Sequence, residues 1–168
     1  VVVSNGTAPT VTSAAAVLTV DSLPNYTFST IAGLAGTSGS TNATGSSARF
    51  NNPTGVAFDS AGNLYVADRN NSLIRKITPA GVVTTLLSGV GSPVGIVCVG
   101  SNLYFTTTAH EVRVVATDGT GSAVLAGMAS TSGTTDASGA AARFNLPQGI
   151  ASDGTNLYVA DRGNHSVR

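Results

Sequence analysis

The chain has 168 residues, of which 20 are glycine and only 10% are charged, a composition typical of short strands joined by tight turns. Eight basic residues balance eight acidic ones, so the formal net charge is zero and no broad positive field exists to attract nucleic acid or anionic lipid. No apolar run approaches the roughly 20 residues that a membrane-spanning helix needs, so we also expect no membrane insertion.

The first 33 residues precede the first complete unit of the chain. Residues 1–20 carry two apolar runs, Val1–Val3 and Ala14–Val20, that resemble the last two strands of a bacterial Ig-like domain. Residues 21–25 form the predicted linker. Residues 26–33 match the fourth strand of the units described next, so we expect them to act as a closing strand that pairs with the last unit of a ring.

The strongest pattern in the chain is an internal repeat. Residues 31–59 align without a gap onto residues 125–153, and 17 of the 29 aligned positions are identical. A weaker copy lies between them, because the Pro-x-Gly step at Pro53 recurs at Pro93 and Pro147, 40 and then 54 positions later. A period near 40 residues that is made of strand-sized pieces predicts the blades of a β-propeller. The expected blades span about residues 53–89, 93–127 and 147–168.

Four strand-like runs alternate with turn residues inside the first unit. The runs cover residues 55–59, 63–67, 73–78 and 82–87, and the turn residues between them cover 60–62, 68–71 and 79–81. Gly, Pro, Asn, Asp and Ser are the residues that tight turns favour. Each unit is therefore predicted to be a four-stranded antiparallel sheet.

These units resemble the NHL repeat. The resemblance rests on the steps Ala48–Asp59, Gly62–Asp68 and Ile74–Ile77, and the Asn-His-Leu step of the family stands here as Asn71-Ser72-Leu73 and as Asn164-His165-Ser166. It implies an all-β fold of the bacterial extracellular type: a partial β-propeller of about three four-stranded antiparallel NHL-type blades over residues 26–168. Because a closed ring needs at least about four blades, we expect a section of a longer polypeptide that, if isolated, exposes unpaired strand edges.

Alternating strand direction is expected to bring the loops after the second and fourth strands to one face. That face would carry the long inserts 34–52 and 128–146. It would also carry the predicted ligand contacts, which are Arg49, Asp68, Arg69, Asn71, Arg143, Asp161, Arg162 and Asn164. Since the same residues recur in two units, the alternative is structural: an arginine pairs with a carboxylate and joins adjacent blades.

Four further residues are candidate metal ligands, namely His110, His165, Asp59 and Asp153. Some NHL-type propeller enzymes that resemble amidating lyases use histidine ligands, and some propeller hydrolases bind calcium, so calcium or zinc is implied only if the chain is an enzyme. The structural alternative places the histidines and aspartates in turns. The motifs of nucleophilic hydrolases, zinc proteases and phosphate-binding loops are absent, so we expect no catalytic residue and no cofactor.

The sequence therefore favours a non-catalytic scaffold or binding module, secreted or on the cell surface. Its propeller loops would contact a protein or a glycan, or the chain would associate with itself through open propeller edges. The rival hypothesis is a metal-dependent propeller lyase or hydrolase whose site lies in blades outside this chain. RNA binding requires a basic face, and seven arginines and one lysine spread among eight acidic residues argue against it.

Overall fold

The computed structural model describes residues 28–168, so the predictions for residues 1–20 and 21–25 lie outside the described residues. Within residues 28–168, eleven strands form three antiparallel sheets, and four 3-10 helices of three residues each lie between them. This confirms the predicted fold class, an all-β partial β-propeller. Within residues 28–168, no helix has the length and apolar character needed to cross a membrane.

Each sheet is an up-and-down meander in which strands that follow one another in sequence pair with each other. Blade 1 consists of β1 (Pro53–Phe58), β2 (Leu64–Asp68), β3 (Leu73–Ile77) and β4 (Val83–Ser88). Blade 2 consists of β5 (Pro93–Val99), β6 (Asn102–Thr107), β7 (Glu111–Ala116) and β8 (Ala123–Gly127). Blade 3 consists of β9 (Ile150–Ser152), β10 (Leu157–Asp161) and β11 (Ser166–Val167). The 3-10 helices are η1 (Gly45–Ser47), η2 (Arg69–Asn71), η3 (Gly139–Ala141) and η4 (Arg162–Asn164).

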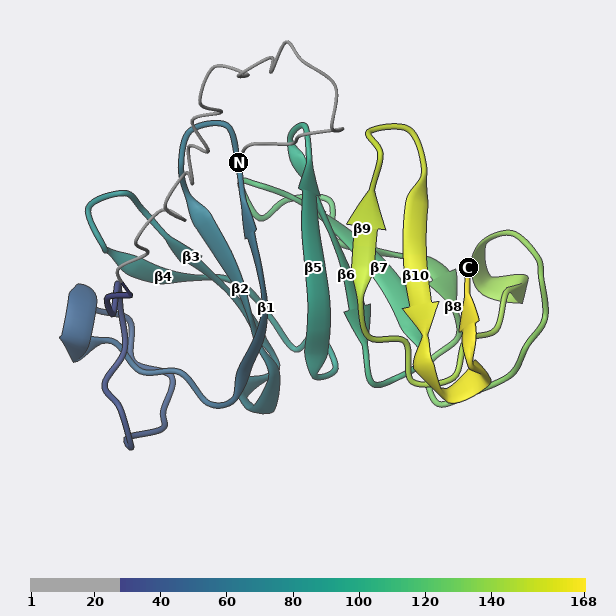
Figure 1. The fold of residues 1–168 in the computed structure, drawn as a ribbon, viewed down its shortest axis with the longest axis horizontal. Coiled ribbons are helices and arrows are strands. Elements are labelled where there is room, and N and C mark those ends of the chain that lie inside the picture. Colours follow the sequence, from purple (N-terminus) through teal and green to yellow (C-terminus); the bar gives the residue numbers. More distant parts are fainter. Residues whose placement is uncertain (1–27) are drawn as a thin grey trace, which may run out of the picture.

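The three blades stand side by side, with β5 between β1 and β9 (Figure 1). Glycine allows this close approach. A Cβ atom on Gly55 would lie 2.5 Å from the Val94 carbonyl oxygen, and one on Gly95 would lie 2.2 Å from the Gln148 carbonyl oxygen. Because real Cβ atoms do not approach carbonyl oxygens so closely, the repeated Pro-x-Gly step sets the spacing between neighbouring blades.

Two of the three buried apolar clusters among the described residues lie between blades, and the third joins blade 1 to the insert 34–52. Tyr65, Ala67 and Ile74 of blade 1 pack in one buried cluster with Ile96, Leu103, Phe105 and Val115 of blade 2. A second cluster joins Val112 of blade 2 to Phe144 and Val159. Apolar burial of this kind stabilises by about 25 cal/mol per Å² of area removed from water. Blade 1 therefore shares part of its apolar burial with blade 2, and blade 2 shares part of its own with blade 3.

Each of the inserts 34–52 and 128–146 lies beside a 3-10 helix, because the Asn51 carbonyl oxygen accepts the Asn70 N–H of η2 at 3.1 Å and the Asn145 carbonyl oxygen accepts the Gly163 N–H of η4 at 2.7 Å. The turns between β1 and β2 and between β9 and β10 lie at the opposite side. We call the side with the inserts the loop face. It gathers the loops that the sequence analysis expected to find together.

Residues 28–33 are the described part of the predicted closing strand. They belong to none of the three sheets, and the Gly33 N–H donates to the Gly45 carbonyl oxygen at 3.0 Å. Since the expected partner of this segment is the last blade of a closed ring, its pairing stays a prediction.

Candidate functional site

Asp68 forms the centre of a buried polar cluster on the loop face. It is the last residue of β2, and its carboxylate accepts hydrogen bonds from the Asn51 N–H at 2.7 Å, from Asn71 Nδ2 at 2.8 Å and from Arg75 Nη1 at 3.0 Å. The side chains of Asp68 and Arg75 are both fully buried. The charge of each is therefore compensated by the other, as a buried ion pair requires.

Arg75 connects the sheet to the insert 34–52. Its guanidinium donates to the carbonyl oxygens of Arg49 at 3.0 Å and Thr41 at 3.2 Å, and to Asn42 Oδ1 at 2.6 Å. The same guanidinium lies 5.2 Å from the centre of the Phe50 ring. Backbone carbonyls are acceptors that an arginine fork satisfies well, so one side chain fixes several points of the insert.

Blade 3 repeats this cluster. Asp161 accepts from the Asn145 N–H at 2.7 Å, from Asn164 Nδ2 at 2.7 Å and from Arg168 Nη1 at 3.3 Å. Arg168 also donates to the carbonyl oxygens of Arg143 and Thr135 and pairs with Asp136. Two copies of the same arrangement hold two inserts of related sequence.

The sequence predicted that an arginine pairs with a carboxylate and joins adjacent blades. This prediction is wrong, both in the partner residue and in its location. Asp68 pairs with Arg75 inside one sheet, whereas the Arg49 guanidinium donates to the carbonyl oxygens of Ser46 and Ala48, both at 2.7 Å. Antiparallel pairing of β2 with β3 brings Arg75 beside Asp68, and no local pattern around Asp68 predicts that contact. The signal that could have found it is the repeated Ile-Arg or Val-Arg step at Arg75 and Arg168.

The remaining arginines of the predicted site lie elsewhere on the loop face. Arg143 repeats the local contacts of Arg49, donating to two nearby carbonyl oxygens. Arg69 is the first residue of η2, and Arg162 is the first residue of η4. Within residues 28–168, neither side chain makes a hydrogen bond or an ion pair. Arg162 is exposed and Arg69 half-buried. Ligand contact by these residues stays a prediction.

Blade 2 indicates the role of the buried aspartate cluster. The connection from β4 to β5 holds only residues 89–92, so no long insert precedes blade 2. Thr107 stands where the other blades have aspartate, and Arg113 pairs instead with Glu111 at 3.2 Å. The aspartate is therefore absent in the one blade that lacks an insert, which indicates that it serves to hold the insert.

Asp59 and Asp153 are turn residues. Asp59 accepts from the N–H groups of Ala61 and Asn63 and from the Tyr65 hydroxyl, and these bonds, with that of the Asn63 side chain foremost, lower its pKa to about 2. Asp153 makes the equivalent contacts, and backbone hydrogen bonds from the turn are the main cause of its lowered pKa. Their lone pairs are used within the turn, as in an Asx turn.

The two histidines occupy equivalent positions at the end of the turn between second and third strands. His110 and His165 both have left-handed backbone, with φ of 70° and 55°. His110 Nδ1 accepts the Leu146 N–H at 3.0 Å, whereas His165 is exposed. Among residues 28–168, no group of three or more His, Cys, Asp or Glu side chains could hold a metal ion.

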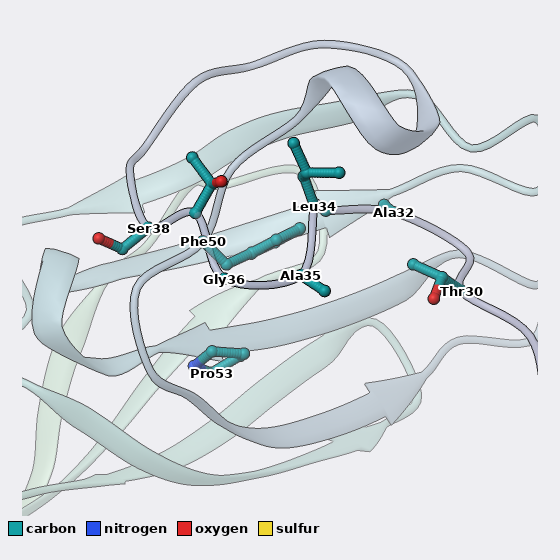
Figure 2. Close-up of a pocket in the computed structure, with 10 residues that line it drawn as sticks. Thr30, Ala32, Leu34, Ala35, Gly36, Ser38, Phe50 and Pro53 are labelled. Carbon is teal, nitrogen blue, oxygen red and sulfur yellow. The ribbon is translucent and has the colours of Figure 1, made fainter.

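The hollows of the surface are shallow and mostly uncharged. The pocket in Figure 2 has a volume of about 460 Å³ and lies between the start of the insert, the Phe50 ring and Pro53. A second pocket of about 290 Å³ lies where the three Pro-x-Gly steps meet. Neither pocket is lined by an ionisable side chain, so neither offers a general acid or base.

Comparison with known proteins agrees with this geometry. The model of the NHL repeat matches residues 50–77 and 144–168, which are the two segments that contain the aspartate clusters. The chain contains NHL repeats. Among curated proteins, none matches the chain.

Solved structures with a similar fold include proteins of different kinds. An auxiliary nutrient binding protein from Bacteroides ovatus has a TM-score of 0.61 and 21% identity over 80% of this chain and 40% of its own. A protein of unknown function from Bacteroides thetaiotaomicron has a TM-score of 0.57 and 22% identity over 63% and 31%. Virginiamycin B lyase from Staphylococcus aureus has a TM-score of 0.53 and 17% identity over 74% and 43%. The NHL blades described here thus span less than half of the length of each.

Proposed function

We propose that the chain is a non-catalytic binding module, secreted or on the cell surface, that presents its two inserts to a protein or a glycan. The observation that carries this proposal is the placement of the repeated charged residues. Asp68 and Arg75 are fully buried and hold an insert, so they position a surface and do not themselves form one. The same set of residues recurs with each of the two inserts, and the need to hold the insert explains this recurrence best.

The outer surface of the inserts suits contact by hydrogen bonds. Most residues of 34–47 and 128–141 are exposed, and they are chiefly Ser, Thr, Gly and Ala. Small polar side chains give adaptable hydrogen bonding, and a fixed backbone lowers the entropy lost on binding. The structural neighbours are named as a nutrient-binding protein and as a lyase, so the fold alone favours neither class of function.

The test is binding of the labelled chain to arrays of immobilised polysaccharides and of extracellular peptides. The decisive variant combines Ser46→Ala and Ser47→Ala, two exposed hydroxyls on η1. The second insert already has Ala140 and Ala141 at these positions, so the fold accepts the change. Loss of two hydrogen bonds predicts about a tenfold weaker affinity.

The matched control combines Ser60→Ala with Ser101→Ala, two exposed serines outside the loop face. Binding should be unchanged in this variant. No binding to either array, or equal losses in both variants, would contradict the proposal. Turnover of lactone or peptide substrates that disappears on chelation of calcium or zinc would support the rival enzyme hypothesis instead.

A further inference from the structure

The formal net charge of zero hides a segregation of charge between two sides of the molecule. All seven arginines and four of the acidic residues lie in the half next to the loop face. The other half, which holds the turns after the first and third strands, carries Lys76, Asp59, Asp118 and Asp153 among residues 28–168. Lys76 belongs there because it lies 5.6 Å from the centre of the Tyr65 ring, whose hydroxyl donates to Asp59. The loop face therefore has a surplus of positive charge, and the opposite side has a surplus of negative charge.

Ion pairs on the loop face leave four arginines uncompensated. The four acidic residues of this half all pair with Arg75, Arg113 or Arg168, and Arg168 pairs with two of them. The other arginines have no acidic partner within the described part of the chain. They are Arg49, Arg69, Arg143 and Arg162. The zero net charge of the whole chain therefore gives no measure of the charge that a ligand of the loop face would meet.

Arg49 and Arg143 are held in place without being neutralised. The stem of each packs against a glycine, because a Cβ atom on Gly39 would lie 3.0 Å from the Arg49 Cβ, and one on Gly133 would lie 2.9 Å from the Arg143 Cβ. Nη1 of each arginine donates to two backbone carbonyl oxygens at 2.6 to 2.7 Å. Because carbonyl oxygens carry no net charge, the guanidinium stays cationic. Its fixed position reduces the side-chain entropy that binding would cost.

Arg69 and Arg162 lie close to these fixed cations in the backbone. The hydrogen bonds from Asn70 to the Asn51 carbonyl oxygen and from Gly163 to the Asn145 carbonyl oxygen join η2 and η4 to the ends of the two inserts. Blade 2 has Thr108 at the position of Arg69 and lacks an insert. A pair of uncompensated arginines therefore accompanies each insert and is missing where the insert is missing.

We propose that the loop face binds a polysaccharide that carries carboxylate or sulfate groups, and that the two arginine pairs contact these groups. The proposal rests on the proposed function and names the chemical class of its ligand. Guanidinium groups match the geometry of oxyanions and bind them through two hydrogen bonds. A polymer that repeats its charged groups engages both arginine pairs at once, and this raises its overall affinity. Bound anions also relieve the mutual repulsion of four like charges on one face.

The aromatic residues of the inserts argue against a nucleic acid as the anion. Proteins that bind single strands stack the bases on exposed aromatic rings. The only aromatic residues of the inserts are Phe50 and Phe144. The Arg75 guanidinium lies 5.2 Å from the centre of the Phe50 ring, and that of Arg168 lies 5.4 Å from the centre of the Phe144 ring. Both rings are thus occupied within the protein, whereas exposed serine and threonine hydroxyls remain to bind the hydroxyl groups of a sugar.

The first test compares three polymers with the same backbone, which are dextran, carboxymethyl dextran and dextran sulfate. Isothermal titration should show binding to a charged dextran and none to neutral dextran, and it shows which oxyanion is preferred. The affinity should fall as the salt concentration rises from roughly 0.05 M to 0.3 M, because salt screens exposed charges. No binding to either charged polymer would overturn the proposal. If a neutral glycan or a peptide still bound through Ser46 and Ser47, the proposed function would stand without it.

The decisive variant combines Arg69→Gln with Arg162→Gln. Neither side chain makes a hydrogen bond or an ion pair within residues 28–168, so the circular dichroism spectrum and the urea midpoint should not change. Binding to the charged dextran should weaken about tenfold and depend less on salt, since two exposed charge contacts are lost. Unchanged binding would overturn the proposal.

The matched control combines Ser60→Glu with Ser101→Glu. Both serines are exposed and lie in turns after first strands, on the side opposite the loop face. The control lowers the net charge by the same amount as the arginine variant, but it should bind the charged dextran as the parent chain does. Equal losses in the two variants would show that only the overall charge matters, and this would refute the loop face as the site.

A last comparison separates the two classes of polyanion. The parent chain is titrated with single-stranded polyuridylate and with the preferred charged dextran at the same salt concentration. We expect the dextran to bind more tightly, because the occupied phenylalanine rings offer the bases no stacking surface. Tighter binding of polyuridylate would overturn the assignment to a polysaccharide.

Discussion

Asp68 and Arg75 illustrate how burial sets the energetic weight of a charged residue. Asp68→Asn keeps the size of the side chain but leaves the fully buried Arg75 guanidinium without its counter-charge. We expect a loss of about 3–5 kcal/mol in the free energy of unfolding. The equivalent Asp161→Asn should cost less, because Arg168 is 17% exposed and keeps Asp136 as a partner. Urea denaturation of both variants measures the difference, and equal losses would show that burial does not set the cost.

Asp59 gives the fold a dependence on acid pH. Its pKa falls from 3.8 to about 2 on folding, because the Asn63 side chain and the turn N–H groups hydrogen-bond the carboxylate. The stabilisation is therefore complete above the unfolded-state pKa and is lost as the pH falls through about 2. Urea titrations at several pH values measure this effect. Between pH 3.8 and about 2, the free energy of unfolding should fall less steeply in Asp59→Asn than in the parent chain. Identical pH profiles for the variant and the parent chain would contradict this role.

Each insert is held by its own clamp, which is a hydrogen bond from the asparagine of the aspartate cluster to a carbonyl oxygen of the insert. Asn71 Nδ2 donates to the Gly39 carbonyl oxygen at 2.7 Å, and Asn164 Nδ2 donates to that of Gly133 at 2.6 Å. Asn71→Ala should speed hydrogen exchange within residues 34–52 about tenfold, since one buried hydrogen bond contributes about 1 kcal/mol and the Asp68 carboxylate also loses a donor. Asn164→Ala should do the same only within residues 128–146. Exchange that rises in both inserts for either variant would show that the clamps are not independent.

At the scale of the whole molecule, stability depends on what covers the outer blades. If copies of the chain associate through their outer blades, the thermal midpoint rises with protein concentration, because association stabilises the folded chain by mass action. Calorimetric scans at concentrations that differ a hundredfold make this comparison. A constant midpoint for the parent chain would show that its outer faces remain uncovered.

The sequence by itself determined the repeated architecture of this protein. Strand alternation and turn chemistry are local properties, and a 29-residue segment that recurs 94 positions later with 17 identities encodes the same structure twice. The blades, the turn roles of Asp59 and Asp153 and the gathering of the inserts on one face were therefore predictable.

Tertiary structure alone decided which residues meet. The partner of Asp68 is Arg75 and not Arg49, because the register of β2 with β3 and the path of the insert place the guanidinium beside the carboxylate. The difference in exposure between Tyr65 and Tyr158 likewise follows from which blade stands next to each strand, although both occur in the same Leu-Tyr-Val-Ala-Asp sequence. The register of neighbouring strands and the packing of whole sheets, and not the sequence around one residue, decide which side chains come into contact.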